Sequence, residues 1–184
     1  MKTALVLIDI QNDYFKGGTN ELVGQEAAAK KAAKILALFR RKNLPIFHVQ
    51  HIATSAGATF FLPNTRGSQI YELVAPLPHE PIIVKHAPDS FLGTELNERL
   101  KALGAERILV CGSMSHMCID TTVRSAMEKG FKAVLAHDAC ATKDLSFNGE
   151  NLPAALVHKA FMAAMSRVFA DVKSTDEVLA DFSE

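Results

Sequence analysis

The chain has 184 residues, of which 48% are hydrophobic and 22% are charged. This length suits one domain with a sizeable core, and we expect residues 1–184 to form a single globular unit. The 20 basic and 20 acidic side chains cancel, so the net positive charge that nucleic acid or an anionic membrane would attract is absent.

The cysteine count and the apolar runs bear on the cellular compartment. Three cysteines are an odd number in a chain of this size, which favours a reducing compartment over a disulfide framework. Residues 4–8 are too few for the core of a signal peptide, and no apolar run approaches the roughly 18 residues of a membrane span. We therefore expect a cytoplasmic protein whose partner is neither a membrane nor a nucleic acid.

Segments with the pattern of strands alternate with segments of helical spacing. Short apolar runs predict strands at residues 4–10, 45–50, 81–84, 107–111, 131–137 and 168–172. Apolar residues at helical spacing predict helices at residues 24–42, 94–103, 118–129, 152–165 and 174–179. Gly104 and Gly130 are placed to end two of the helices, and Ser174 to cap the last. This alternation predicts a three-layer α/β/α domain with a mostly parallel, Rossmann-like sheet of about six strands.

Two segments read as loops. Residues 11–18 are polar and glycine-rich and follow the first strand, at the sheet edge where α/β proteins bind ligands. Residues 52–80 are interrupted by glycine and proline, and a long irregular segment in a compact domain is usually a functional loop. Phe60 in this loop either caps an apolar pocket or anchors the loop to the core.

The turn at residues 112–118, with the sequence GSMSHMC, lies between a predicted strand and a predicted helix. A helix that starts here would hold the Cys118 sulfur at its positive end, which favours a thiolate. Its free backbone N–H groups would also face an anion that forms beside the sulfur. The expected geometry is that of a nucleophile elbow, although a free cysteine is more often a small buried hydrophobe.

Three reactive side chains stand at or just past the carboxyl ends of three predicted strands: Asp9, Lys85 and Cys118. The carboxyl ends of parallel strands meet at one edge of the sheet, so we expect these residues to lie close together. A carboxylate can take the thiol proton and return it to a leaving amine, while an ammonium stabilises the anionic intermediate. Alternatively, Asp9 caps a loop and Lys85 is a solvated strand end.

These residues lie in segments that resemble the isochorismatase-like cysteine hydrolases, which include nicotinamidases and N-carbamoylsarcosine amidohydrolases. The segments are LIDIQNDYF at 7–15, VKHAPDSF at 84–91, GSMSHMC at 112–118 with Thr121, Thr122 and residues 124–126 behind it, and DACA at 138–141. They follow the order of that family and cover nearly the whole chain. The resemblance implies an isochorismatase-type fold with a catalytic triad of Asp9, Lys85 and Cys118.

The resemblance implies further details of the site. It places a cis peptide bond at Ser113-Met114 and an oxyanion hole at the N–H groups of Met114 and Cys118. It suggests that Phe15, His116, Met117 and Phe60 shape the substrate pocket. Metal-binding nicotinamidases carry Asp-x-His where this chain has His51-Ile52-Ala53, so no metal and no other cofactor is expected. Members of the family commonly form dimers or larger assemblies, so a homo-oligomer is expected.

Taken together, these features predict a cysteine-dependent hydrolase that cleaves a C–N bond, in an amide, ureide or carbamoyl group of a small molecule, through a thioester. One alternative is an isochorismatase-type vinyl ether hydrolase, which needs an acid rather than a nucleophile. A second is a catalytically idle ligand-binding or assembly protein on the same fold. A receiver-type phosphoacceptor domain is disfavoured because Lys85 ends the third strand, where such domains need an aspartate.

Overall fold

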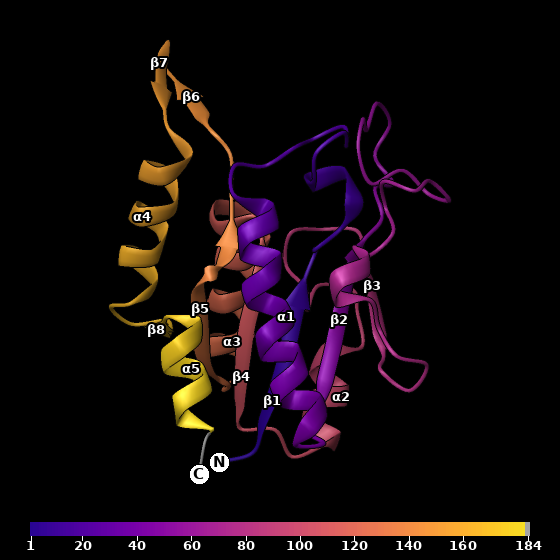
Figure 1. Cartoon of the computed structure of the whole chain (residues 1–184), viewed down its shortest axis with the longest axis vertical. Coiled ribbons are helices and arrows are strands. Elements are labelled where there is room, and N and C mark those ends of the chain that lie inside the picture. The colour runs from indigo at the N-terminus through magenta and orange to yellow at the C-terminus, as the bar shows by residue number, and fades with distance from the viewer. Residues whose placement is uncertain (183–184) are drawn as a thin grey trace.

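A six-stranded parallel sheet forms the middle layer of the protein (Figure 1). The computed structural model describes residues 1–182. Its strands lie in the order β3-β2-β1-β4-β5-β8, and every neighbouring pair is parallel. Their bounds are β1 Thr3–Ile8, β2 Ile46–His51, β3 Ile82–Lys85, β4 Arg107–Ser113, β5 Lys132–Ala141 and β8 Asp171–Lys173. The predicted three-layer α/β fold is confirmed.

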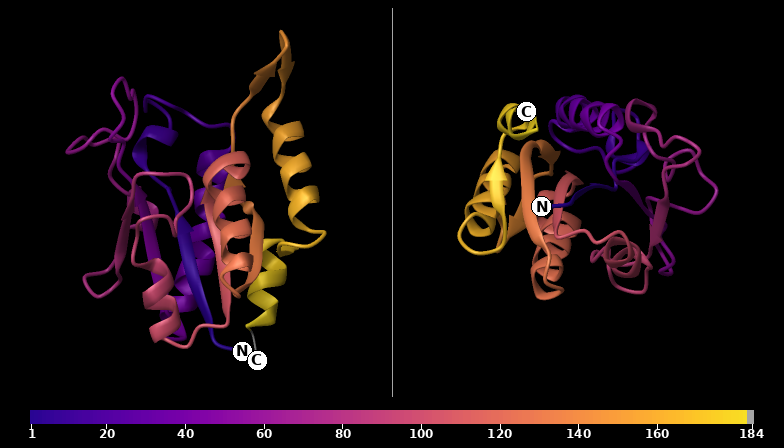
Figure 2. Two further views of the ribbon diagram at one scale, coloured as in Figure 1. Left: turned by 180° about the vertical axis from the view of Figure 1, so that it is seen from behind. Right: turned by 90° about the horizontal axis from the view of Figure 1, so that it is seen from below.

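Helices cover both faces of the sheet (Figure 2). The long helices are α1 Gln25–Arg41, α2 Leu96–Ala102, α3 Asp120–Glu128, α4 Ala154–Met165 and α5 Thr175–Asp181. Successive side chains of β1 point alternately to the two faces of the sheet, as in every strand. Leu5 and Leu7 pack in a core with α1 and α5, and Ala4, Val6 and Ile8 pack in a second core with α2, α3 and α4. All six residues of β1 are therefore buried.

Several boundaries differ from the sequence-based expectations. β4 continues to Ser113, two residues beyond the predicted end, and β5 continues past a bulge to Ala141, so residues 138–141 lie in a strand and not in a loop. β8 begins at Asp171 because residues 166–169 still belong to the turn that ends α4. The short hairpin of β6 Leu145–Phe147 and β7 Glu150–Leu152 was not predicted, since its strands lack an apolar alternation.

The other predicted elements are present, including the cap of the last helix, although β1 ends at Ile8 and not at residue 10, and α4 begins at Ala154 because Leu152 belongs to β7. Ser174 accepts a hydrogen bond from the Glu177 amide, and Glu177 accepts one in return from the Ser174 amide, which completes a capping box. Gly104 and Gly130 adopt the left-handed conformation after α2 and α3. Within residues 1–182, no helix combines the length and the apolar character that crossing a bilayer demands.

The loop at residues 52–80 is irregular, as predicted, except for a 3-10 turn η2 at Glu72–Val74. Phe61 anchors it: the ring is fully buried, and its backbone amide donates to Asp13 Oδ2 at 2.6 Å. A second anchor lies at the other end, where Glu80 accepts hydrogen bonds from Arg40, from His48 and from the Leu77 amide. The loop is thus tied to the domain at Phe61 and Glu80, and between them residues 67–71 form backbone hydrogen bonds with the segment after β1.

Glu80 carries a perturbed pKa that makes this second anchor sensitive to acid. Burial alone would raise the pKa of its carboxyl, but the hydrogen bonds and charge of Arg40, with the Leu77 amide and His48, lower it to about 2. A carboxyl with a lowered pKa stabilises the fold above its ordinary pKa, and the gain is lost as the pH falls toward the folded value. The sensitive window therefore runs from about pH 4.5 down to about 2.

We expect the free energy of unfolding to fall by about 3 kcal/mol across this window, and Glu80→Gln to remove most of that dependence. Urea unfolding at several pH values measures it, with Glu150→Gln, a change at an exposed carboxyl, as the control. A Glu80→Gln variant that loses as much stability between pH 4.5 and 2 as the parent protein would contradict the assignment.

Candidate active site

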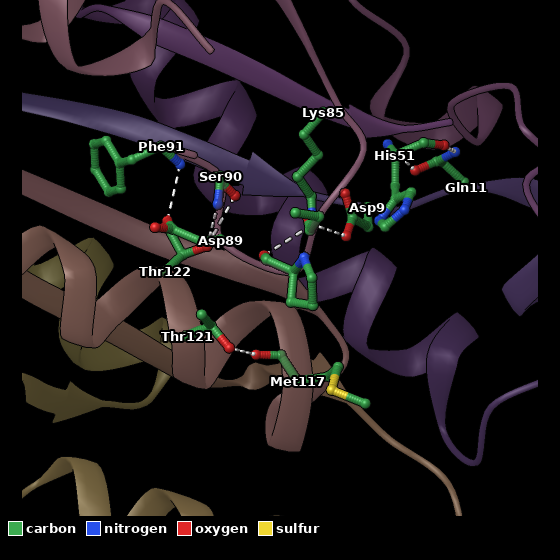
Figure 3. Close-up of polar contacts among 12 residues, drawn as sticks. Asp9, Gln11, His51, Lys85, Asp89, Ser90, Phe91, Met117, Thr121 and Thr122 are labelled. Carbon is green, nitrogen blue, oxygen red and sulfur yellow. Dashed lines mark hydrogen bonds and ion pairs between the residues drawn. The ribbon is translucent and has the colours of Figure 1, made fainter. Parts of the chain in front are cut away.

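A buried ion pair joins the carboxyl ends of β1 and β3. Asp9 directly follows β1, Lys85 is the last residue of β3, and both side chains are inaccessible to solvent. Lys85 Nζ lies 2.8 Å from Asp9 Oδ2, and it also donates to the backbone oxygens of Ala87 at 3.1 Å and Pro88 at 3.0 Å (Figure 3). Three acceptors therefore surround the ammonium group.

The charges of this pair support each other. Burial disfavours the ammonium form of Lys85, but the charges and hydrogen bonds of Asp9 and Cys118 together outweigh that effect and keep the pKa of Lys85 above its usual value. Asp9 itself has a positive φ of 52°, an uncommon conformation for a residue other than glycine. Its Oδ1 atom is buried and has no hydrogen-bond partner within residues 1–182. One carboxylate oxygen is thus held by Lys85 while the other remains available.

Cys118 is carried by the turn that follows β4. The peptide bond between Ser113 and Met114 is cis, at the place where the family resemblance put it. A single wide helical turn, Ser115–Ile119, precedes α3, so the helix begins three residues before Cys118 rather than at it. The Met114 carbonyl accepts from the amides of Met117 and Ile119, and the Cys118 amide between them does not use this acceptor.

Two residues fix the start of this turn. Gly112 has a φ of 125°, and a Cβ atom at this position would collide with the Ile8 carbonyl of the neighbouring strand. Ser113 Oγ donates to Gln25 Oε1 at 2.6 Å, and both side chains are buried. Gln25 is the first residue of α1, so this hydrogen bond ties the turn to a helix on the opposite face of the sheet.

The thiol of Cys118 lies next to the ion pair. Its sulfur, a carboxylate oxygen of Asp9 and a ring nitrogen of His51 all lie within 4.8 Å of one another. Only 3% of the Cys118 surface is exposed. Burial, and then the Asp9 charge, raise the pKa of the thiol well above its usual value, and the Lys85 charge only partly opposes them. Burial of the sulfur therefore acts against the thiolate that the start of a helix favours.

His51 is the residue of this site that the sequence analysis did not assign. It ends β2, beside Lys85 of β3 in register, and its backbone is held by two hydrogen bonds to the buried side chain of Gln11. Figure 3 shows Asp9 between Lys85 and His51. The sequence did contain a signal for His51, because β2 lies between β1 and β3, the strands that position Asp9 and Lys85. A histidine at its carboxyl end has to reach the same edge.

The residues expected to shape the pocket lie in different places. Phe60 lines a cavity of about 380 Å³ together with His51, Phe61 and His86. Phe15 is stacked on Tyr71, with ring centroids 3.6 Å apart, and lines a separate cavity of about 840 Å³ beside α1. Neither of these two cavities is lined by Asp9, Lys85 or Cys118.

The other two expected pocket residues sit on the wide turn. His116 Nδ1 is 2.6 Å from Thr142 Oγ1, and the ring faces Phe161, so its polar edge is engaged with the protein. Met117 is 43% exposed, and its backbone oxygen accepts a hydrogen bond from Thr121 Oγ1 (Figure 3). Neither residue borders the cavity that Phe60 lines.

The cluster of Asp9, His51 and Cys118 contains the types of side chain that bind transition metals. However, the Lys85 ammonium lies 2.8 Å from the Asp9 carboxylate and already neutralises it. A cation bound beside it would face a like charge in a buried site, which is costly. We therefore assign no metal to these residues.

The layered fold and the site define an α/β protein with a cysteine, a carboxylate and a lysine at the carboxyl edge of a parallel sheet. Residues 3–177 match the isochorismatase domain. The chain belongs to the isochorismatase family of hydrolases. A family protein of Bacillus subtilis, YddQ, is 52% identical over 97% of this chain and 99% of its own length. A solved structure of a candidate isochorismatase hydrolase from Oleispira antarctica superposes with a TM-score of 0.94 at 48% identity, covering 97% of this chain and 96% of that one.

Relatives with named activities are more distant. A streptothricin hydrolase from Streptomyces noursei is 32% identical over 85% of this chain and 57% of its own length. Nicotinamidase 3 of Arabidopsis thaliana is 28% identical, over 86% of this chain and 80% of its own length. An N-carbamoylsarcosine amidase of Arthrobacter is 24% identical, over 97% of this chain and 70% of its own length.

The ion pair yields a stability prediction. Replacing Lys85 by Met leaves the Asp9 charge buried without a partner, which we expect to cost about 3–5 kcal/mol of unfolding free energy. The double variant Asp9→Asn/Lys85→Met removes both charges and should recover part of the loss. Urea unfolding of the two variants and the parent measures this. Equal stability of the single and double variants would show that the two charges do not support each other.

Proposed function

We propose that the protein is a cysteine-dependent hydrolase that cleaves a C–N bond of a small molecule, in an amide, ureide or carbamoyl group. The observation that carries this proposal is the Cys118 thiol beside a carboxylate that an ammonium holds in place. The relatives named above as a nicotinamidase and a carbamoylsarcosine amidase support the choice of bond. The two preceding alternatives, a vinyl ether hydrolase and an idle protein, give this cysteine no role.

In the first half-reaction Asp9 is the base. Burial raises the pKa of the Cys118 thiol, so we expect it to be protonated before substrate binds, and a carboxylate oxygen of Asp9 lies within 4.8 Å of its sulfur as a proton acceptor. Transfer of the thiol proton to Asp9 lets the sulfur attack the carbonyl carbon of the substrate. Asp9 then returns the proton to the leaving nitrogen as the C–N bond breaks, which leaves a thioester on Cys118.

Charge on the carbonyl oxygen is stabilised by the wide turn and by Lys85. The amides of Met114 and Cys118 flank the cis peptide and the sulfur, and the Cys118 amide is not bound to the Met114 carbonyl. Donors that are already in place need no reorganisation when the oxyanion forms. Lys85 stays protonated throughout, because its pKa is raised, and contributes a fixed positive charge.

The test is a screen of primary amides, ureides and carbamoyl compounds for release of ammonia. For any substrate found, Cys118→Ala is expected to lower the rate on the order of 10³-fold or more, because the thioester can no longer form. Intact mass after rapid quenching should show the acyl group on the parent protein and not on the variant.

The matched control is Cys111→Ala, which removes a buried core thiol and should leave the rate unchanged. Hydrolysis that is unaffected by Cys118→Ala would overturn the proposal and favour acid-catalysed cleavage without a nucleophile.

A further inference from the structure

His51 has no task in the half-reaction described above. Its imidazole is only partly buried, and one ring nitrogen lies within 4.8 Å of both the Asp9 carboxylate and the Cys118 sulfur. It also borders the cavity of about 380 Å³ that opens beside the site. His51 therefore lies near the thiol and also lines this cavity.

The His51 backbone is fixed by a neighbouring side chain, and its ring packs against an aromatic residue. The side chain of Gln11 is fully buried and forms two hydrogen bonds with the His51 backbone. Its Nε2 donates to the His51 oxygen at 2.8 Å, and its Oε1 accepts from the His51 amide at 2.8 Å. The ring packs against Phe61, with centroids 5.8 Å apart. Groups that act on protons in a reaction need this kind of fixed placement.

The protonation state of His51 suits a base. Burial lowers the pKa of its imidazole, Asp9 opposes this, and the charges of Lys85 and His86 lower it further. The ring is therefore neutral at neutral pH and carries one nitrogen with a free lone pair. A proton is accepted at the nitrogen that carries the lone pair, so a role as base requires the tautomer in which this nitrogen faces Asp9 and the sulfur and the N–H is on the other ring nitrogen.

The second half-reaction calls for a stronger base than the first. Water is a far weaker acid than a thiol, and the Asp9 carboxylate is already engaged by the Lys85 ammonium at 2.8 Å. An imidazole ordinarily has a pKa of about 6.5, against about 3.9 for a carboxyl. Two polar atoms up to 4.8 Å apart can share one water, because each hydrogen bond spans about 2.8 Å.

We propose that His51 is the general base of the hydrolytic half-reaction and activates the water that attacks the Cys118 thioester. This inference rests on the proposed function. His51 takes one proton of the water while the oxygen bonds to the acyl carbon. The tetrahedral intermediate collapses, the C–S bond breaks, and the sulfur leaves with the electron pair. The proton on His51 passes to that sulfur, which restores the thiol and the neutral imidazole and releases a carboxylic acid.

The probe for the test is p-nitrophenyl acetate, which can acetylate a cysteine and release a coloured phenolate. In the parent protein, a burst of one phenolate per site should precede a steady rate that reports hydrolysis of the acetyl thioester. His51→Gln should keep the burst and lower the steady rate by about 100-fold, within the range of general base catalysis. Acetylated protein should accumulate in its intact mass spectrum. His79→Gln, a change at an exposed histidine, is the control.

Hydroxylamine separates a chemical role from a structural one. It attacks thioesters without the help of a base, so it should restore the turnover of His51→Gln to near the parent value. A variant that lost turnover because the site is distorted would not be rescued.

The possible failures differ. A burst with an unchanged steady rate in His51→Gln, or a slow rate that hydroxylamine does not rescue, overturns this inference alone. A parent protein with no burst, or with one that survives in Cys118→Ala, overturns the proposed function and this inference with it.

Discussion

The buried contact between Asp9 and Lys85 is the constraint around which the site is built. Two opposite charges without solvent access are stable only as a pair, because removing one leaves the other unpaired in a medium of low polarity. Their positions are fixed by β1 and β3, which are not neighbours but flank β2. Any shift of one strand along another would separate them, so the pair depends on the register of three strands.

The same contact sets the chemistry of the thiol. Burial makes the sulfur a poor acid in the resting site, and Asp9 adds to that effect, while Lys85 partly cancels it. Lys85 thus stabilises an anion near the site without giving up a proton. A cysteine kept as a thiol until it is needed is less exposed to oxidation than one held as a thiolate. The cost is that its proton must be removed by a neighbour.

Much of the fold and of the site could be predicted from the sequence, for reasons visible in the residues. Fully buried parallel strands leave continuous apolar runs, so β1 and β4 were clear, and Gly104, Gly130 and Ser174 marked helix ends. The convergence of Asp9, Lys85 and Cys118 followed from the parallel sheet alone. Each of these signals is local, or depends on a rule that holds for every sheet of this type.

What could not be predicted depends on the balance of distant contacts. The wide turn before α3 is set by close approach of Gly112 to Ile8 and by the hydrogen bond between Ser113 and Gln25, whose partners are 88 positions apart. The raised pKa of Cys118 reflects burial by several segments. The sequence does not distinguish His48 from His51, yet His48 is hydrogen-bonded to the buried Glu80, whereas a ring nitrogen of His51 lies near the Cys118 sulfur.

The two anchors of the 52–80 loop have a consequence for how the protein can diversify. Phe61 and Glu80 attach to α1, β2 and the segment after β1 through contacts that do not involve the thiol or the ion pair. The wall of the cavity beside His51 comes largely from residues 53–60, before the first anchor. Ala53 in this wall donates a backbone hydrogen bond to Phe61, so the wall is fixed at the first anchor. Substitutions of its exposed side chains can therefore change the shape of this cavity without altering the contact between Asp9 and Lys85.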